Sequence, residues 1–182
     1  MNRPPSILSA LALAAALSAP ALAAAERGPS TPTERRRAVE TTRRLERDPL
    51  GRGANEGRRW LLRWIVEIPD ISVRGCSGPL DALAQGESGR YGKLLYAQSV
   101  FGQAAFLIEH PQQKGDWVAV QTAGVESVLR AYGALLAAEP DARRDELDLL
   151  LEARRQGRLR DVIEQTMEGC GEERAPAPGE AI

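Results

Sequence analysis

The chain has 182 residues, with 24 lysines and arginines against 25 aspartates and glutamates, which gives a formal net charge of −1. This length is typical of one domain with a sizeable core. One histidine and two cysteines are too few for the ligand cluster of a metal site. The basic part of the chain lacks the interleaved aromatic residues of a nucleic-acid-binding platform, so we expect neither a metal nor a nucleic-acid partner.

Residues 1–25 have the pattern of a secretory signal peptide. Arg3 provides the positive start, residues 7–17 form an apolar run, and the small residues Ala21 and Ala23 provide a cleavage pattern. The run is shorter than the ~20 apolar residues that a spanning helix needs. We therefore expect cleavage near residues 23–25, a mature chain without a transmembrane span, and a periplasmic or secreted location.

After the signal peptide, the composition predicts a linker at 26–33, a helical domain at 34–171 and a disordered tail at 172–182. Charge is spread unevenly: residues 26–63 carry eleven arginines and six acids, whereas residues 109–182 carry fifteen acids and nine basic residues. Two interpretations are open. The two charged regions can attract each other or form ordinary solvated faces, or the basic segment can contact anionic lipid headgroups or a partner.

The first predicted helix begins with a capping box, in which Thr31 and Glu34 flank Pro32 at the first helical position. It continues to about Arg47. Because it is polar on nearly every side, we expect it to pack weakly on the domain or to be partly disordered. Its apolar residues are Ala38, Val39 and Leu45.

The next helix is predicted over residues 57–68, before Pro69. Its apolar residues recur at helical spacing and form one stripe, made of Trp60, Leu61, Trp64, Ile65 and Ile68. Tryptophan and arginine are enriched where proteins bind partners, so one interpretation is an interaction surface made of Trp60, Trp64, Arg59 and Arg63. The other interpretation places both tryptophans in the core of a domain that has few aromatic residues.

A long irregular connection, rich in glycine, is predicted at 70–89, with a short helical turn possible at 79–85. Cys76 lies in this loop, and Cys170 follows the last predicted helix. Two cysteines in an oxidising compartment most often pair, so we expect a disulfide between them. Closing a loop of about 95 residues contributes roughly 4–5 kcal/mol in the chain-entropy model. A reactive thiol pair is the alternative.

Two long helices follow at 91–109 and 116–138, and the short connection between them predicts an antiparallel pair. Both contain interior glycines, each of which costs up to about 1 kcal/mol relative to alanine. We expect a close approach of neighbouring backbones to offset this cost at Gly102, Gly124 and Gly133.

Two shorter helices complete the prediction. Asp141 is expected to cap a helix that ends near Gly157, and a last helix is predicted over residues 158–168. No segment longer than three residues alternates as a strand does. The fold class is therefore predicted as all-α, a compact bundle of five or six helices with a long irregular middle loop and one disulfide.

The two central helices carry polar residues among apolar ones, namely Gln98, Gln103, Gln121, Glu126 and Arg130. If they face inward, they form a satisfied buried network, or Gln103, Glu126 and Arg130 line a small polar pocket. If they face outward, they form an ordinary solvated stripe. The sequence leaves these alternatives open.

The sequence contains no motif that specifies a reaction. There is no Gly-x-Ser-x-Gly, no His-Glu-x-x-His and no phosphate-binding glycine loop after a strand. The only histidine, His110, precedes Pro111 at a helix end, where a protonated ring favours the helix dipole. We therefore assign no catalytic residue and no cofactor.

Two successive predicted helices end in a similar way, at Phe106-Leu-Ile-Glu-His-Pro111 and Leu135-Leu-Ala-Ala-Glu-Pro140. Over residues 103–156 this arrangement is similar to tetratricopeptide repeats. The spacing falls short of that family's period, and the family's Trp, Leu-Gly and Ala positions are not matched. The resemblance implies a helical adaptor with a concave peptide groove.

Three functions follow as expectations. The leading one is a secreted or periplasmic non-enzymatic helical domain that binds a protein or an envelope component. The first alternative is the tetratricopeptide-like adaptor. The second is a small-ligand carrier or enzyme with its polar pocket between the two central helices.

Overall fold

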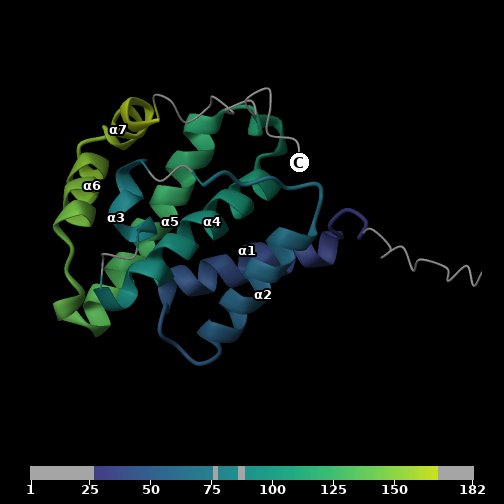
Figure 1. Ribbon diagram of the computed structural model, residues 1–182, viewed down its shortest axis with the longest axis horizontal. Helices are drawn as coiled ribbons and strands as arrows, with labels where there is room; N and C mark the ends of the chain where they lie inside the picture. Colours follow the sequence, from purple (N-terminus) through teal and green to yellow (C-terminus); the bar gives the residue numbers. More distant parts are fainter. Residues whose placement is uncertain (1–26, 76–77, 86–88, 168–182) are drawn as a thin grey trace, which may run out of the picture.

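The computed structural model describes residues 27–75, 78–85 and 89–167. These residues form seven α-helices and four short 3₁₀ helices, and none of them lies in a strand (Figure 1). The predicted all-α class is confirmed. There is one α-helix more than expected because the possible helical turn in the middle connection forms α3. The predicted signal peptide and C-terminal tail lie outside the described residues.

The helices follow one another with short connections. The α-helices are α1 (Pro32–Arg47), α2 (Ala54–Glu67), α3 (Asp81–Ala84), α4 (Gly92–Glu109), α5 (Trp117–Ala138), α6 (Asp145–Arg155) and α7 (Leu159–Thr166). The 3₁₀ helices are η1 (Gly78–Leu80), η2 (Gly89–Tyr91), η3 (Pro111–Gln113) and η4 (Pro140–Ala142). The helix ends predicted at Arg47, Glu109 and Ala138 are those of the structure.

The antiparallel pair α4–α5 is the centre of the fold, as predicted (Figure 1). A Cβ added at Gly102 would collide with the Cβ of Ser127, and one at Gly124 would lie 2.9 Å from the carbonyl oxygen of Ser99. Close backbone approach therefore accounts for these two glycines. The same expectation for Gly133 is wrong, because nothing lies within 4 Å of a Cβ added there.

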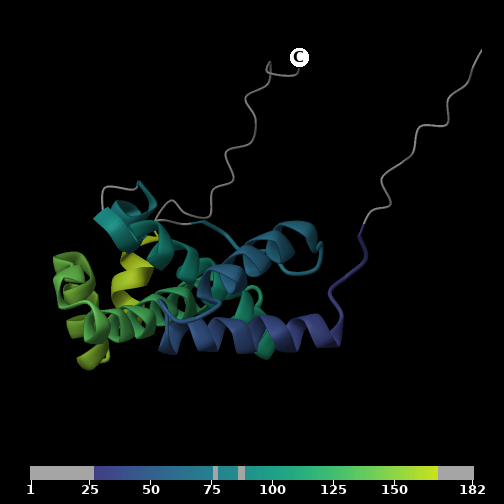
Figure 2. The same ribbon diagram turned by 90° about the horizontal axis from the view of Figure 1, so that it is seen from below.

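The other helices cover the central pair from two sides. The α1–α2 pair packs on one side, and α6 and α7 pack on the other, against α5 (Figures 1 and 2). Each side has its own hydrophobic cluster. The first is built around Leu45, Leu61, Trp64 and Phe101, and the second around Leu95, Leu129, Tyr132, Leu135 and Leu147.

Helix α1 packs closely on the domain, so the expectation of weak packing is wrong. The capping box forms as predicted: Glu34 N–H donates to Thr31 Oγ1, and Thr31 N–H donates to the Glu34 carboxylate. Ala38 and Leu45 are buried against α4 and α5. Three polar residues, Thr41, Thr42 and Glu46, are buried on the same face, and an apolar pattern does not reveal them.

Two predicted helix starts need correction. Helix α2 begins three residues early, at Ala54, because Gly53 adopts a left-handed conformation (φ 77°) that ends the preceding turn. Asp141 does not cap α6. It lies inside η4, where Ala142 N–H donates to the Glu139 carbonyl at 2.9 Å. The backbone is extended after η4 (Arg143 ψ 141°), so the helix starts only at Asp145.

The similar sequences at the ends of α4 and α5 fold alike. In each, the residue after the helix donates its N–H to the carbonyl four positions earlier, at 2.7 Å for His110 and 2.8 Å for Glu139. A proline then opens a 3₁₀ helix, η3 or η4. This local repeat is compatible with the tetratricopeptide-like adaptor, which stays a prediction.

The predicted disulfide is not tested, because Cys76 and Cys170 both lie outside the described residues. Their described neighbours are close together. A Cβ added at Gly78 would lie 3.4 Å from Thr166 Oγ1, so η1 and the end of α7 are in contact. The pairing stays a prediction.

Residues 27–31, which the composition assigns to a linker, contact the helical domain. Ser30 is buried, and its N–H and hydroxyl both donate to the Asp70 carboxylate at 2.7 Å. Burial alone would raise the pKa of Asp70, but these hydrogen bonds and one from Arg35 lower it below its usual value. The start of α1 is thereby tied to the end of α2.

Candidate functional site

The most unusual surface of the molecule is a set of exposed arginines on α1 and α2, which we call the basic layer. Among the described residues, none of these guanidinium groups has a carboxylate within 4.0 Å: Arg36, Arg37, Arg44, Arg47, Arg52, Arg59 and Arg63. The same two helices and their turn offer only three carboxylates outside ion pairs, from Glu40, Asp48 and Glu56. The layer therefore carries a net positive charge.

Arg58 differs from the arginines of the basic layer, because it is buried under the turn between the two helices. It donates to the Asn55 side chain at 3.0 Å and to the carbonyl of Pro49. Burial lowers the pKa of this guanidinium. Its contacts show that Arg58 fixes the turn.

A groove runs between α1 and α2 within the basic layer. Its lining residues are Arg37, Glu40, Thr41, Arg44, Arg47, Gly53, Glu56, Gly57 and Trp60. The two helices approach closely at Gly57, where an added Cβ would lie 3.0 Å from Thr41 Cγ2 and 3.1 Å from an Arg44 guanidinium nitrogen. The groove is thus shallow at Gly57 and covered there by Arg44.

Trp60 and Trp64, which the sequence analysis placed on one candidate surface, have different environments. Trp64 is 2% exposed and belongs to the hydrophobic cluster under α2, so it offers nothing to a partner. Trp60 is half-buried and stacks on Trp64 with ring centroids 5.7 Å apart. The Arg37 guanidinium lies over the Trp60 ring at 4.1 Å, within the range of a cation–π interaction.

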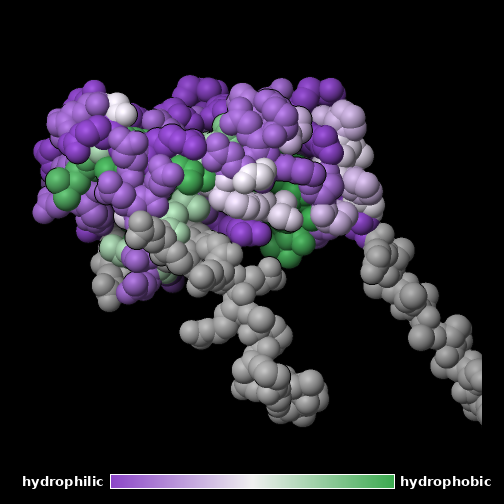
Figure 3. All heavy atoms as spheres, turned by 90° about the horizontal axis from the view of Figure 1, so that it is seen from above, coloured by the Kyte–Doolittle hydropathy of each residue, from purple (hydrophilic) through white to green (hydrophobic). Residues whose placement is uncertain are grey.

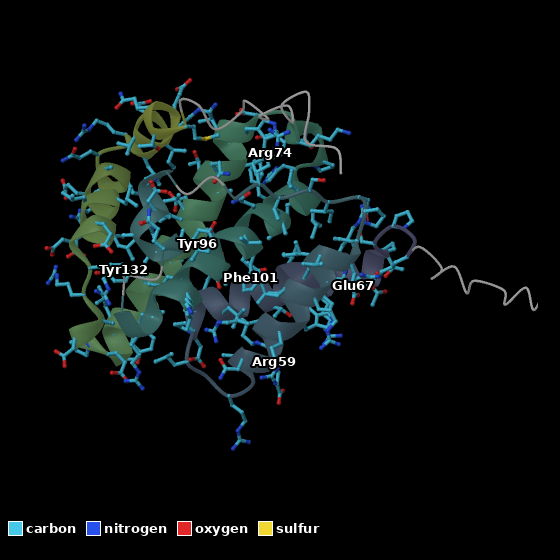
Figure 4. The ribbon with its side chains drawn as sticks, viewed as in Figure 1. Arg59, Glu67, Arg74, Tyr96, Phe101 and Tyr132 are labelled. Carbon is cyan, nitrogen blue, oxygen red and sulfur yellow. The ribbon has the colours of Figure 1, made fainter. Side chains whose placement is uncertain are left out.

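Arg59 and Arg63 lie on the opposite, outer side of α2, together with two apolar residues that the sequence analysis did not consider. Arg59 is at the edge of the molecule, whereas Phe101 lies in the interior between the helices (Figure 4). Helical spacing places Leu62 and Val66 beside the two arginines. They are 44% and 85% exposed. The sequence signal for this outer side was the alternation of apolar and basic residues along the helix.

The predicted polar pocket forms only in part. Glu126 and Arg130 lie together, 3.4 Å apart, in a cavity of about 480 Å³ between α1, α4 and α5. Gln103 does not reach it. Its amide contacts Gln121 at 3.4 Å and the backbone N–H of Arg74 at 3.3 Å, on another side of α4. All three glutamines of the predicted set are buried, so they do not form a solvated stripe.

Glu46 of α1 is the residue of this cavity that sequence analysis missed. It is 4% exposed and accepts hydrogen bonds from Ser127 at 2.6 Å and from Arg43 and Arg130 at 2.9 Å. Burial alone would raise its pKa, but the hydrogen bonds and charges of these partners lower it below the ordinary 4.5. The one feature of the sequence that could have indicated its burial is its position next to Leu45, on the buried face of α1.

No group of three His, Asp, Glu or Cys side chains in the described part of the chain is arranged to hold a metal ion. His110 caps α4 and its ring lies 4.7 Å from Phe106. No helix in the described ranges is long and apolar enough to cross a membrane.

The surface seen in Figure 3 is mostly hydrophilic, and its hydrophobic areas are small and separated by polar residues. Guanidinium groups match carboxylates and phosphates with two parallel hydrogen bonds. Unpaired arginines beside a half-buried tryptophan are suited to binding an anionic partner.

No protein-family model matches the chain. No curated protein and no solved structure gives a significant match. A function for this chain therefore has to be argued from its own residues and their geometry.

Proposed function

We propose that this protein is a secreted or periplasmic, non-enzymatic domain that binds an anionic protein or envelope component through the basic layer on α1 and α2. The observation that carries the proposal is that seven exposed arginines on these elements have no carboxylate partner among the described residues. Like charges held close together oppose folding. The concentration of these arginines on one side is therefore better explained by binding of a partner than by stabilisation of the fold.

The distribution of the remaining charge supports this interpretation. Helix α6, on the other side of the central pair, carries four acids, Asp145, Glu146, Asp148 and Glu152, against two arginines, Arg154 and Arg155. The basic layer does not pair with these acids: its helices make their cross-helix ion pairs with Glu109 and Arg130 of the central pair. The excess of arginines on α1, α2 and the turn between them would orient this side of the molecule toward a negatively charged partner.

The proposal can be tested by retention of envelope components on immobilised protein. The bait is the oxidised mature chain, residues 26–182, incubated with a detergent-solubilised envelope extract at low salt. The test variant is Arg44→Glu/Arg47→Glu in the groove. The matched control is Arg155→Glu/Arg158→Glu, which changes the net charge equally at the opposite side. Circular dichroism melting establishes that each bait is folded.

We expect the wild type and the control to retain the same component, and the groove variant to lose it by about tenfold or more, since several charge-assisted contacts are reversed. The loss must be larger at low salt than at high salt. Equal retention by both variants, or no retention by the folded wild type, contradicts the proposal.

A second candidate function rests on the cavity that contains Glu126 and Arg130. Its charged lining comprises Glu46, Glu109 and Glu126 against Arg43 and Arg130, and Glu126 also pairs with Arg154 at 3.5 Å. The Glu126 side chain keeps 30% exposure, so it is the carboxylate of this lining that a small organic cation can reach. A thermal-shift screen with small amines tests this candidate. A shift in wild type that is lost in Glu126→Gln supports it, and no shift contradicts it.

A further inference from the structure

The exposed apolar side chains of this protein are concentrated at the basic layer. Four large hydrophobic residues are exposed in the described ranges, and three of them, Leu50, Leu62 and Val66, belong to α2 or the turn before it. The fourth, Leu149, is 72% exposed on α6, among acidic residues. Exposed leucines are common one at a time, so the clustering beside arginines is the informative feature.

Leu62 and Val66 are one turn apart and share the outer face of α2 with arginines one turn apart. We call this face the outer stripe; it consists of Asn55, Arg59, Leu62, Arg63 and Val66, all of them exposed. It contains no carboxylate. The nearest acids on α2 are Glu56 and Glu67 at its margins, and Glu67 pairs with Arg27 at 3.4 Å.

The shape and composition of the outer stripe favour a flat partner over a peptide. Arg59, Leu62, Arg63 and Val66 are exposed on the outer face of one helix, and the surface of a single helix is convex. Its arginines point outward without partners, and those of α1 extend the same charge over a wider area. A convex helix face with aliphatic residues between arginines is typical of proteins that rest on an anionic membrane surface.

We propose that the outer stripe docks on an anionic phospholipid bilayer. Leu62 and Val66 enter the headgroup region, Arg59 and Arg63 pair with lipid phosphates, and the acidic helix α6 faces away from the membrane. This inference rests on the proposed function, because it names a lipid surface as the anionic partner. An acidic protein is the other outcome of the tests.

The inference is tested by flotation of the full mature protein with vesicles. One set contains phosphatidylcholine alone, and the other contains phosphatidylcholine with phosphatidylglycerol. The test variant is Leu62→Ser/Val66→Ser, and the control is Leu149→Ser, which removes a leucine that is 72% exposed from an acidic helix. All three side chains are at the surface, so these variants are expected to fold, and melting curves establish this.

We expect the wild type and Leu149→Ser to float with the phosphatidylglycerol vesicles, to stay unbound with phosphatidylcholine alone, and to dissociate at high salt. Leu62→Ser/Val66→Ser should bind about tenfold more weakly, because it loses its buried aliphatic contacts. Equal binding to both vesicle types, no binding by wild type, or equal losses in both variants overturns the inference.

Failure of this inference and failure of the proposed function give different results. If the vesicles do not bind wild type but the envelope extract yields a protein that Arg44→Glu/Arg47→Glu no longer retains, the partner is an acidic protein and only the lipid assignment falls. If Arg44→Glu/Arg47→Glu retains the same envelope components as wild type, the basic layer itself is not the binding surface.

Discussion

Glu46 joins α1 to the central pair through a buried carboxylate. Its carboxylate accepts hydrogen bonds from Ser127 and Arg130 of α5 and from Arg43 of its own helix. Ser127 in turn accepts a hydrogen bond from Gln98 of α4 at 2.9 Å. A buried charge with several partners is costly to disrupt, because its former partners are left unsatisfied.

Replacing Glu46 with glutamine keeps the size of the side chain and removes its charge. We expect Glu46→Gln to lower the free energy of unfolding by about 2–3 kcal/mol. Glu126→Gln removes a half-buried carboxylate from the same cavity and should cost no more than about 1 kcal/mol. Urea unfolding monitored by circular dichroism measures both. If the two variants lose similar amounts of unfolding free energy, the carboxylate of Glu46 contributes no more to stability than that of Glu126, which would contradict this account.

The lowered pKa of Glu46 makes this contribution depend on pH. A carboxylate with a folded-state pKa below its unfolded-state value stabilises the fold above the unfolded value, and the stabilisation is lost as pH falls toward the folded value. The gap in unfolding free energy between wild type and Glu46→Gln should therefore be largest near neutral pH. It should narrow from about pH 4.5 downward. A gap that stays constant between about pH 7 and about pH 3 would contradict the assignment.

At the scale of elements, the closest contact is the crossing of α4 and α5 at Gly102. An added Cβ there would collide with Ser127 and lie 3.0 Å from the Ala123 carbonyl oxygen. We expect Gly102→Ala to lower the free energy of unfolding by about 1–3 kcal/mol through overpacking. The control, Gly133→Ala, faces open space in α5 and should stabilise by up to about 1 kcal/mol. Thermal or urea melts compare the two, and the same sign of change in both would contradict this packing.

How well each helix could be predicted from the sequence depends on whether its buried face is apolar. Helices α4 and α5 were predicted closely because they are rich in apolar residues and their connection is short. Helix α1 was located correctly from Thr31, Pro32 and Glu34, yet its packing was missed because part of its buried face is polar. Apolar periodicity reports burial only where burial is apolar.

Helix α2 shows the same limit for the candidate site. The stripe of Trp60, Leu61 and Trp64 identifies the inward direction, but the sequence alone does not say how far each residue is buried. Trp64 is covered by the cluster below it, whereas Trp60 is left half-buried beside Arg37. The missing information is tertiary: the position of α1 decides which tryptophan stays accessible.

The predicted pocket residues are divided between two groups for a related reason. Gln103, Glu126 and Arg130 all lie on the central helices, but they face different neighbours. Glu126 and Arg130 meet Glu46 of α1, and Gln103 meets Arg74 from the connection after α2. Residues from distant parts of the chain complete both groups, and no spacing within α4 and α5 indicates them.

At the scale of the whole molecule, the predicted Cys76–Cys170 bridge would join the middle connection to the end of the chain. Peptide mapping without reduction should recover the two cysteines in one linked peptide. Reduction should lower the free energy of unfolding by roughly 4–5 kcal/mol in the chain-entropy model. Rapid alkylation of both thiols in the folded, unreduced protein would contradict the bridge.

Helices α1 and α2, which carry the basic layer, lie on one side of the central pair, and α6 lies on the other (Figure 1). Helix α6 has four acids and two arginines. The sequence shows the imbalance between its two ends, but two interpretations were open: mutual attraction, or a separate basic surface. The ion pairs of the structure do not join α1 or α2 to α6 in the described residues. This separation favours the basic surface.

The most direct test of that surface is site-specific photo-crosslinking in an envelope fraction. A benzoylphenylalanine residue is introduced at Val66, on the outer side of α2, or at Leu149 on α6, two apolar positions that are 85% and 72% exposed. Our account predicts abundant adducts with envelope components from position 66 and few from position 149. Equal adducts from both positions, or adducts from position 149 alone, would contradict the basic layer as the binding surface.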